Sequence, residues 1–188
     1  MISAAAAPQR LALASASPRR LALLEQIGLR PDEVLPANID EAPRLDERPR
    51  NLALRLALEK GRAAQKSMSD TTPAYHNFII ATATTVSGRA HDVITAVAVS
   101  APDGREGSRV VESRVTFKRL SHTEVEGYVA SGEWKGKAGG YAIQGQAGAF
   151  VTDISGSYSA IVGLPLYETA SLLEGLGYLV ARRWEPRA

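Results

Sequence analysis

The sequence predicts an α/β protein built on a mixed, twisted sheet. Apolar segments typical of buried strands alternate along the chain with helical segments, and this order is typical of an α/β fold. Two β-branched runs, residues 91–99 and 109–117, flank a turn-like segment at 102–107, which predicts a long hairpin within the sheet. A length of 188 residues is enough for one domain with a substantial core, so we expect residues 1–188 to form a single domain.

The first expected elements are a strand and a helix joined by a short turn. Residues 11–14 form a short apolar run that fits a buried strand. Ser17 suits the N-cap position of the following helix, and Pro18 suits its first position, where no amide hydrogen is needed. Gly28 is a natural helix stop. The apolar stripe of this helix consists of Leu21, Leu23, Leu24 and Ile27.

Three further helices and several short strands follow. A helix rich in Leu and Ala covers residues 51–66, and a capping box at residues 121–124 opens another helix that runs to about Ser131. Residues 163–166 lead into a last helix that ends near Leu176. The other expected strands are residues 34–35, 78–81, 149–154 and 178–184.

The composition excludes several classes of protein. Without cysteine the chain can form neither disulfides nor zinc–thiolate sites. No apolar run approaches the roughly 20 residues that a membrane helix needs, and we find no signal peptide, so we expect a cytoplasmic protein with no membrane partner. The net charge of +2 favours anionic partners only weakly. Because the basic residues are dispersed and aromatic residues are only 6%, we expect no nucleic-acid partner.

The turn before the first helix is a candidate phosphate site. A helix N-terminus offers free backbone amides and a partial positive charge. Ser15 and Ser17 add hydroxyl donors, and Arg19 and Arg20 add forked donors that match phosphate oxygens. Together these groups predict a polyphosphate cradle, although a capped helix with two solvated arginines fits the same residues.

Two other polar positions are candidates for chemistry. Asp40 and Glu41 lie on a loop, where a carboxylate could hold Mg²⁺ or orient a water molecule; a solvated acidic turn is the alternative. Lys60 lies within the Leu- and Ala-rich helix and could reach a phosphate; the alternative is a lysine on a wet helix face.

A glycine-rich segment at residues 136–148 is the fourth candidate. Glycines allow the backbone to approach a ligand closely, and the Gln144 amide both donates and accepts hydrogen bonds, so it could read the edge of a base. A turn between two strands is the alternative interpretation.

In this order along one chain, the motifs resemble the Maf (septum-formation) family of nucleoside triphosphate pyrophosphatases. The resemblance extends from Leu11 to about Gly177. The matching segments are ASASPRR, IDE, LALEKGRAA, SGRAHDVITAVAV, VTFKRLSHTEVEGYVASGEW, KAGGYAIQG and GSYSAIVGLPLYETASLL.

The resemblance implies a fold and an activity. The fold would be Maf/ITPase-like, with an elongated mixed sheet, flanking helices and a cleft between two lobes. The family hydrolyses nucleoside triphosphates to a nucleoside monophosphate and pyrophosphate with a divalent cation, Mg²⁺ or Mn²⁺, and its members are often homodimers. The stretch KAGGYAIQGQAGAFV resembles the branch that acts on dTTP and UTP, which implies house-cleaning of the nucleotide pool and a link to arrest of cell division.

Residue roles can be carried over by motif. Phosphate binding would fall to Lys60, which would also act in catalysis, and to the cradle residues Ser15, Ser17, Arg19 and Arg20. The resemblance also implies a role for three other residues: Glu41 in metal or water binding and catalysis, Gln144 (with Arg19) in substrate choice, and Lys137 in substrate binding.

The chain departs from the family pattern after Ala81. There the family has an Asp-Thr-Val-Val motif, a loop with Gly-Lys-Pro and a helix, and then Ser-Gly-Arg. Here Ala81 is followed by residues 82–86, with sequence Thr-Ala-Thr-Thr-Val, and at once by Ser87-Gly88-Arg89. The catalytic aspartate, its threonine neighbour and a second lysine therefore have no counterpart.

Two explanations fit this departure. Either the molecule contains the segment and the sequence between Ala81 and Ser87 omits it, or the segment is truly deleted. The family-like residues on both sides favour the first explanation. The first predicts an active pyrophosphatase, and the second predicts a catalytically impaired nucleotide-binding protein that regulates septum formation.

Overall fold

The computed structural model describes residues 9–69, 77–87 and 91–184, which form a six-stranded mixed sheet. The strand order is β2-β1-β3-β4-β5-β6. Strands β1 (Arg10–Leu13), β2 (Glu33–Val34) and β3 (Asn77–Ser87) are parallel to one another. Strands β3 to β6 are antiparallel, with β4 at His91–Ser100, β5 at Glu106–Phe117 and β6 at Val151–Ser155. The predicted mixed α/β sheet is confirmed.

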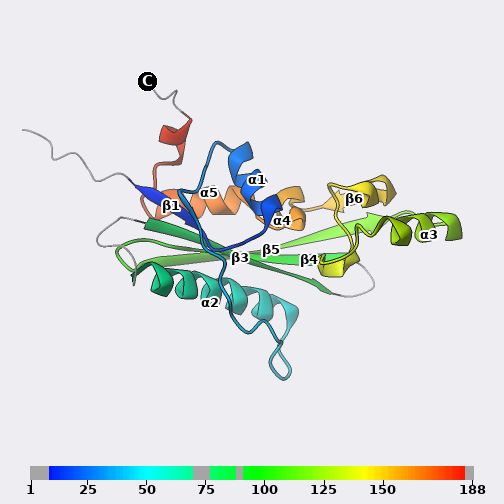
Figure 1. Cartoon of the computed structure of the whole chain (residues 1–188), viewed down its shortest axis with the longest axis horizontal. Coiled ribbons are helices and arrows are strands. Elements are labelled where there is room, and N and C mark those ends of the chain that lie inside the picture. The colour runs from blue at the N-terminus through cyan, green and yellow to red at the C-terminus, as the bar shows by residue number, and fades with distance from the viewer. Residues whose placement is uncertain (1–8, 70–76, 88–90, 185–188) are drawn as a thin grey trace, which may run out of the picture.

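Helices cover both faces of the sheet (Figure 1). Helix α2 (Pro49–Ser69) lies on one face, and α1 (Pro18–Gln26), α4 (Tyr158–Val162) and α5 (Leu166–Gly175) lie on the other. Apolar side chains fill the space on both sides, so each face of the sheet has its own core. In the part of the chain that the structure describes, no helix is both long enough and apolar enough to span a bilayer.

The local signals for the first half of the chain predicted its elements well. Ser17 occupies the N-cap of α1, and Gly28 follows its end with a φ of 72°, a conformation that glycine adopts without steric cost. The hairpin of β4 and β5 pairs in register from His91 opposite Val115 to Ser100 opposite Glu106.

Strand β3 is longer than predicted. The sequence predicted a strand at residues 78–81, whereas β3 continues through residues 82–87, opposite residues 92–97 of β4. This extension contains four β-branched residues, which fit a pleated surface well. The core beside it is not exposed: Ala83 and Ile94 pack with buried residues of α2. Strands β3 and β4 therefore stay paired along the whole of this extension.

The predicted strand at residues 178–184 is wrong. This segment forms a 3-10 helix at Val180–Arg183. Tyr178 and Val180 are both buried, which gives the alternation typical of a strand. However, a strand formed by this segment could pair with β1 only if one edge of β1 were free. Strand β1 is already paired with β2 on one side and with β3 on the other.

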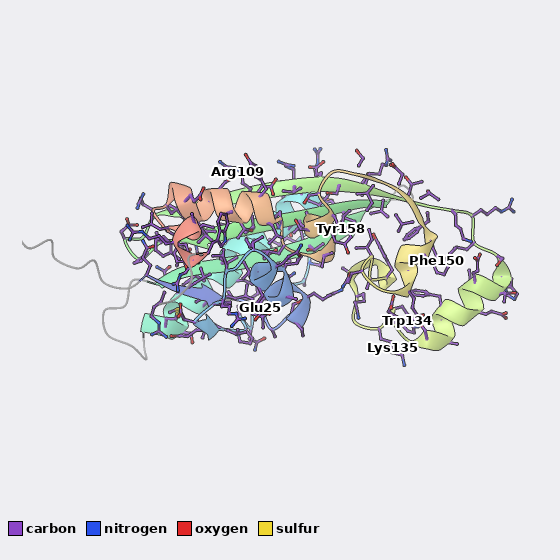
Figure 2. All side chains as sticks on the ribbon, turned by 90° about the horizontal axis from the view of Figure 1, so that it is seen from above. Glu25, Arg109, Trp134, Lys135, Phe150 and Tyr158 are labelled. Atoms are coloured by element: carbon purple, nitrogen blue, oxygen red, sulfur yellow. The ribbon has the colours of Figure 1, made fainter. Side chains whose placement is uncertain are left out.

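The far end of β5 leads into a second lobe. Helix α3 (His122–Ser131) begins at the predicted capping box, in which Ser121 and Glu124 bond each other's backbone amides. Short 3-10 helices follow at Ala138–Gly140 (η1) and Gln146–Phe150 (η2), so part of the segment predicted as a strand at residues 149–154 is helical. Figure 2 shows Trp134, Lys135 and Phe150 together at this end, apart from the main body that carries Glu25 and Arg109.

Candidate functional site

A polar cleft of about 280 Å³ lies between the main body and the segment after α3. Strands β3 and β4 contribute Thr84 and Val93 to its wall. The residues that line the cleft are Ser17, Arg19, Arg20, Glu41, Lys60, Thr84, Val93, Gly136, Ala138, Tyr141, Ala142, Ile143, Gln144, Ile161, Val162 and Gly163. Six sequence-predicted site residues are thus brought together: Ser17, Arg19, Arg20, Glu41, Lys60 and Gln144.

The first turn of α1 faces the cleft. No acidic residue lies in this turn, and the Ser17 side chain does not cap the helix. Arg20 is fixed in place: its Nε donates to the Gly163 carbonyl at 3.1 Å and a terminal nitrogen donates to Ser15 Oγ at 2.9 Å. Burial, with a smaller effect of neighbouring Arg19, lowers the Arg20 pKa to about 10. This end of the cleft is strongly positive and suits an anion.

Glu41 and Lys60 form an ion pair on the cleft wall. Lys60 Nζ lies 2.8 Å from Glu41 Oε1, and the lysine side chain is 11% exposed against 58% for the glutamate. Lys60 is therefore not on a wet helix face. Because the Lys60 ammonium is desolvated, any further anion that enters the cleft stabilises its charge.

A second hollow of about 280 Å³ adjoins the first. The two hollows share Ser17, Arg20, Glu41 and Lys60, so these polar groups stand where the two meet. Ser15 lines only the second hollow. An extended anion such as a chain of phosphates can therefore contact the same cations from both sides.

Glu41 is the one carboxylate among the described residues that line the cleft. Within the described ranges no three His, Cys, Asp or Glu side chains converge as a metal cage would require. Mg²⁺ is commonly held by one or two carboxylates together with substrate phosphates. This donor set therefore fits a cation that enters with the substrate, with Glu41 as the protein ligand.

The segment after α3 forms the other wall of the cleft. Gly136, Ala138 and Gln144 line it, together with residues 141–143. Its shape is fixed by Glu133, whose carboxylate accepts hydrogen bonds from the backbone N–H groups of Gln146 at 2.9 Å and Ala147 at 3.4 Å. These bonds lower the Glu133 pKa.

Lys137 is the predicted site residue that lines neither hollow. Its ammonium lies 3.4 Å from the carbonyl oxygen of Lys135, a neighbour in sequence. Two groups that sequence reasoning missed are the Thr84 hydroxyl and the Gly163 carbonyl. The signal for Thr84 was alternation: Thr82 and Thr84 share one face of β3, and Thr82 donates to the same Gly163 carbonyl at 3.1 Å.

Comparison with known proteins decides the family. A sequence model described as "Maf-like protein" matches residues 10–176. The chain belongs to the Maf-like family. It is 55% identical to the dTTP/UTP pyrophosphatase of Caulobacter vibrioides over 190 residues, covering 92% of this chain and 98% of that protein. It is also 58% identical over 183 residues to the dTTP/UTP pyrophosphatase of Hyphomonas neptunium, covering 89% and 96% of the two chains.

These relatives of the Maf-like chain contain residues that it lacks. In the Caulobacter alignment, 92% of 188 residues is about 173, although the alignment has 190 positions. About 17 of those positions therefore have no residue in this chain. This shortfall agrees with the departure from the family pattern after Ala81. The motif around Gly88 and Arg89 lies outside the described residues.

Proposed function

We propose that this chain is a nucleoside triphosphate pyrophosphatase that hydrolyses dTTP, UTP and modified pyrimidine nucleotides. The observation that carries the proposal is the convergence of Arg19, Arg20, Lys60 and the α1 N-terminus on one cleft that also holds the Glu41 carboxylate. The relatives' names, at more than half identity over nearly their whole length, support the pyrimidine substrates.

The cations of the cleft would bind the triphosphate and stabilise the leaving group. Water attacks the α-phosphorus, the bond to the oxygen bridging the α and β phosphates breaks, and pyrophosphate leaves with that oxygen. Arg20 is held by Gly163 and Ser15 before the substrate arrives, so little of its freedom is lost on binding. Fixed positive charge at this position offsets the charge that develops on the pyrophosphate.

Glu41 would accept the proton of the attacking water. In the free protein Lys60 is 2.8 Å from this carboxylate and holds it as an ion pair. A bound phosphate competes for Lys60, and this competition frees a Glu41 oxygen for water or for Mg²⁺. A bound Mg²⁺ or Mn²⁺ would neutralise phosphate charge and help to polarise the substrate.

A nucleotide-binding protein that has lost catalysis is the second candidate, and Thr82 is the observation that favours it. Thr82 directly follows Ala81, where the family has its catalytic aspartate, and it is fully buried with its hydroxyl bonded to Gly163. A threonine hydroxyl in this state cannot act as a base at neutral pH. Such a protein would keep the phosphate cradle and could regulate septum formation.

Glu41→Gln separates the two candidates. If the chain is an enzyme that uses Glu41, this variant should lose pyrophosphate release by about 100-fold or more while still binding dTTP, because general base catalysis contributes typically 10²–10⁴-fold. Chelating the divalent cation should have a similar effect on the unsubstituted protein. Turnover that survives Glu41→Gln would remove Glu41 from the chemistry, and absence of turnover in folded, dTTP-binding protein would favour the second candidate.

We also propose that the chain acts in the cytoplasm, where nucleotide pools lie, and as a homodimer. Size-exclusion chromatography with light scattering tests the oligomeric state. A molar mass near the 20.0 kDa of one chain would contradict the dimer.

A further inference from the structure

Thr84 and Thr95 form a hydroxyl pair beneath the cleft. Thr84 lies on β3 and lines the cleft, and Thr95 lies directly opposite on β4. Their Oγ1 atoms are 3.1 Å apart. Thr95 is fully buried, and its Oγ1 is also 2.8 Å from the carbonyl oxygen of Ala160 in α4.

Counting hydrogens fixes the direction of both bonds. A carbonyl oxygen only accepts, and a threonine hydroxyl has a single hydrogen. Thr95 must therefore give its hydrogen to Ala160. The hydrogen of Thr95 is then no longer available for the 3.1 Å hydrogen bond between the two hydroxyls. Thr84 must be the donor in that bond and Thr95 the acceptor. The hydrogen of Thr84 is used inside the protein, and the oxygen keeps only lone pairs for the cleft.

We propose that Thr84 is a specificity-determining contact that accepts a hydrogen bond from an N–H or O–H group of the nucleoside. This inference rests on the proposed function, since it requires a nucleotide in the cleft. The phosphate oxygens of a triphosphate are acceptors and gain nothing from another acceptor. Thr84 therefore belongs to the nucleoside part of the site, and the phosphates belong to the arginine and lysine part.

The surroundings make this contact selective. Val93, Ile161 and Val162 line the cleft beside Thr84, so water has few polar partners there. A group that cannot donate leaves an acceptor desolvated and unpaired, which costs more than the bond itself is worth. Uracil and thymine carry a donor at N3, whereas cytosine carries an acceptor there. The 3′-hydroxyl of the sugar is the other donor of suitable chemistry.

Equilibrium dialysis with modified nucleotides tests the assignment. The triphosphates are dTTP, its N3-methyl form and its 3′-deoxy form, and chromatography afterwards verifies that each remains intact. The unsubstituted protein should bind one of the two analogues about fivefold to 100-fold more weakly than dTTP, the size expected when a desolvated acceptor is left unpaired. Loss with the N3-methyl form identifies the base as the donor, and loss with the 3′-deoxy form identifies the sugar.

Two substitutions of Thr84 complete this test. Thr84→Val keeps the shape and removes the acceptor, so the preference for dTTP over that analogue should disappear. Thr84→Ser keeps the hydroxyl and should retain the preference. Equal discrimination by the unsubstituted protein and Thr84→Val would overturn the assignment. If the unsubstituted, folded protein binds no dTTP at all, the proposed function itself fails and the assignment falls with it.

Thr95→Val tests the hydrogen count. If these residues had a merely structural role, the substitution would not change which base the protein prefers. Without Thr95 Oγ1, the Thr84 hydroxyl is free to donate into the cleft. Where loss with the N3-methyl form has identified the base as the donor, the ratio of UTP to CTP affinity should then fall toward one, because the cytosine N3 can accept from Thr84. Thr95→Ser should keep the original ratio, and a melting curve shows whether Thr95→Val is folded. With the base identified as the donor, an unchanged ratio in folded Thr95→Val would contradict the count.

Discussion

Arg19 and Arg20 are neighbours in sequence but are held very differently. Arg20 is tied to Gly163 and Ser15, whereas Arg19 lines the cleft with no hydrogen-bond partner for its guanidinium among the described residues. A side chain that lines a polar cleft without such an anchor is available for a ligand. We therefore expect Arg19 to meet the triphosphate directly.

Arg19→Ala should weaken dTTP binding by ~1.5–3 kcal/mol, the range for a hydrogen bond between charged groups. Calorimetry on the folded variant measures this loss. Arg109→Ala is a matched control, because Arg109 is exposed on β5 and donates to the carbonyl of its own neighbour, Ser108. An Arg19→Ala variant that binds as tightly as Arg109→Ala would exclude Arg19 from the site.

At this scale short sequence motifs identified residues that converge on the cleft but could not identify Thr84. Arg19, Arg20, Glu41 and Lys60 lie within short motifs whose residue types suggest phosphate chemistry, and all four line the cleft. Thr84 could not be found in this way, because its value depends on Thr95 and on an α4 carbonyl far away in sequence. Tertiary contacts decide which hydroxyls have a free hydrogen.

The glycine-rich wall of the cleft depends on one carboxylate. Glu133 accepts from two backbone amides at the start of η2, and a Cβ built on Gly145 would lie 2.4 Å from Glu133 Oε2. Any side chain at residue 145 would therefore displace the carboxylate. Gln144 is next to Gly145 in sequence and lines the cleft, whereas Glu133 does not line it. Glu133 therefore positions a wall of the cleft from outside.

Glu133→Gln and Gly145→Ala should both raise the KM for dTTP with a smaller effect on kcat, because each loosens the wall. Gly145→Ala should add little in a Glu133→Ala background, where the carboxylate it would strike is gone. Fully additive effects would contradict this coupling. Gly127→Ala is a control at a glycine of α3 that has no positive φ and nothing within 4 Å of its added Cβ.

The same carboxylate predicts a pH dependence of stability. Folding lowers the Glu133 pKa because the carboxylate accepts backbone hydrogen bonds, chiefly from Gln146. The stabilisation is therefore present above the unfolded-state pKa and is lost as pH falls through the folded-state pKa. The melting temperatures of the unsubstituted protein and Glu133→Gln should differ most at neutral pH and converge in acid. A difference that grows in acid would contradict the assignment.

Element predictions succeeded where the signal was local. The Ser121 capping box, the Ser17 N-cap and the β4–β5 hairpin follow from residues close in sequence. The strand expected at residues 178–184 failed because the partners of β1 are set by the whole sheet, not by that segment. The length of β3 failed for a related reason: its extension exists because β4 is there to pair with it.

Across the whole molecule, the cleft gathers groups from opposite ends of the chain. Arg20 comes from the first helix and the Gly163 carbonyl from a segment 143 residues later, and Lys60 comes from the opposite face of the sheet. The phosphate cradle is thus assembled by the fold. The departure after Ala81 leaves these phosphate-binding groups together. Nucleotide binding by this chain therefore does not depend on the catalytic motif that has no counterpart here.

The most direct test is pyrophosphate release with Mn²⁺ from dTTP, UTP, CTP, ATP and GTP by purified, folded protein. We predict turnover of dTTP and UTP, a monophosphate as the second product, and little release from the other nucleotides. Release from none of them, by protein that binds dTTP in parallel dialysis, would contradict the pyrophosphatase and leave a nucleotide-binding protein that has lost its chemistry.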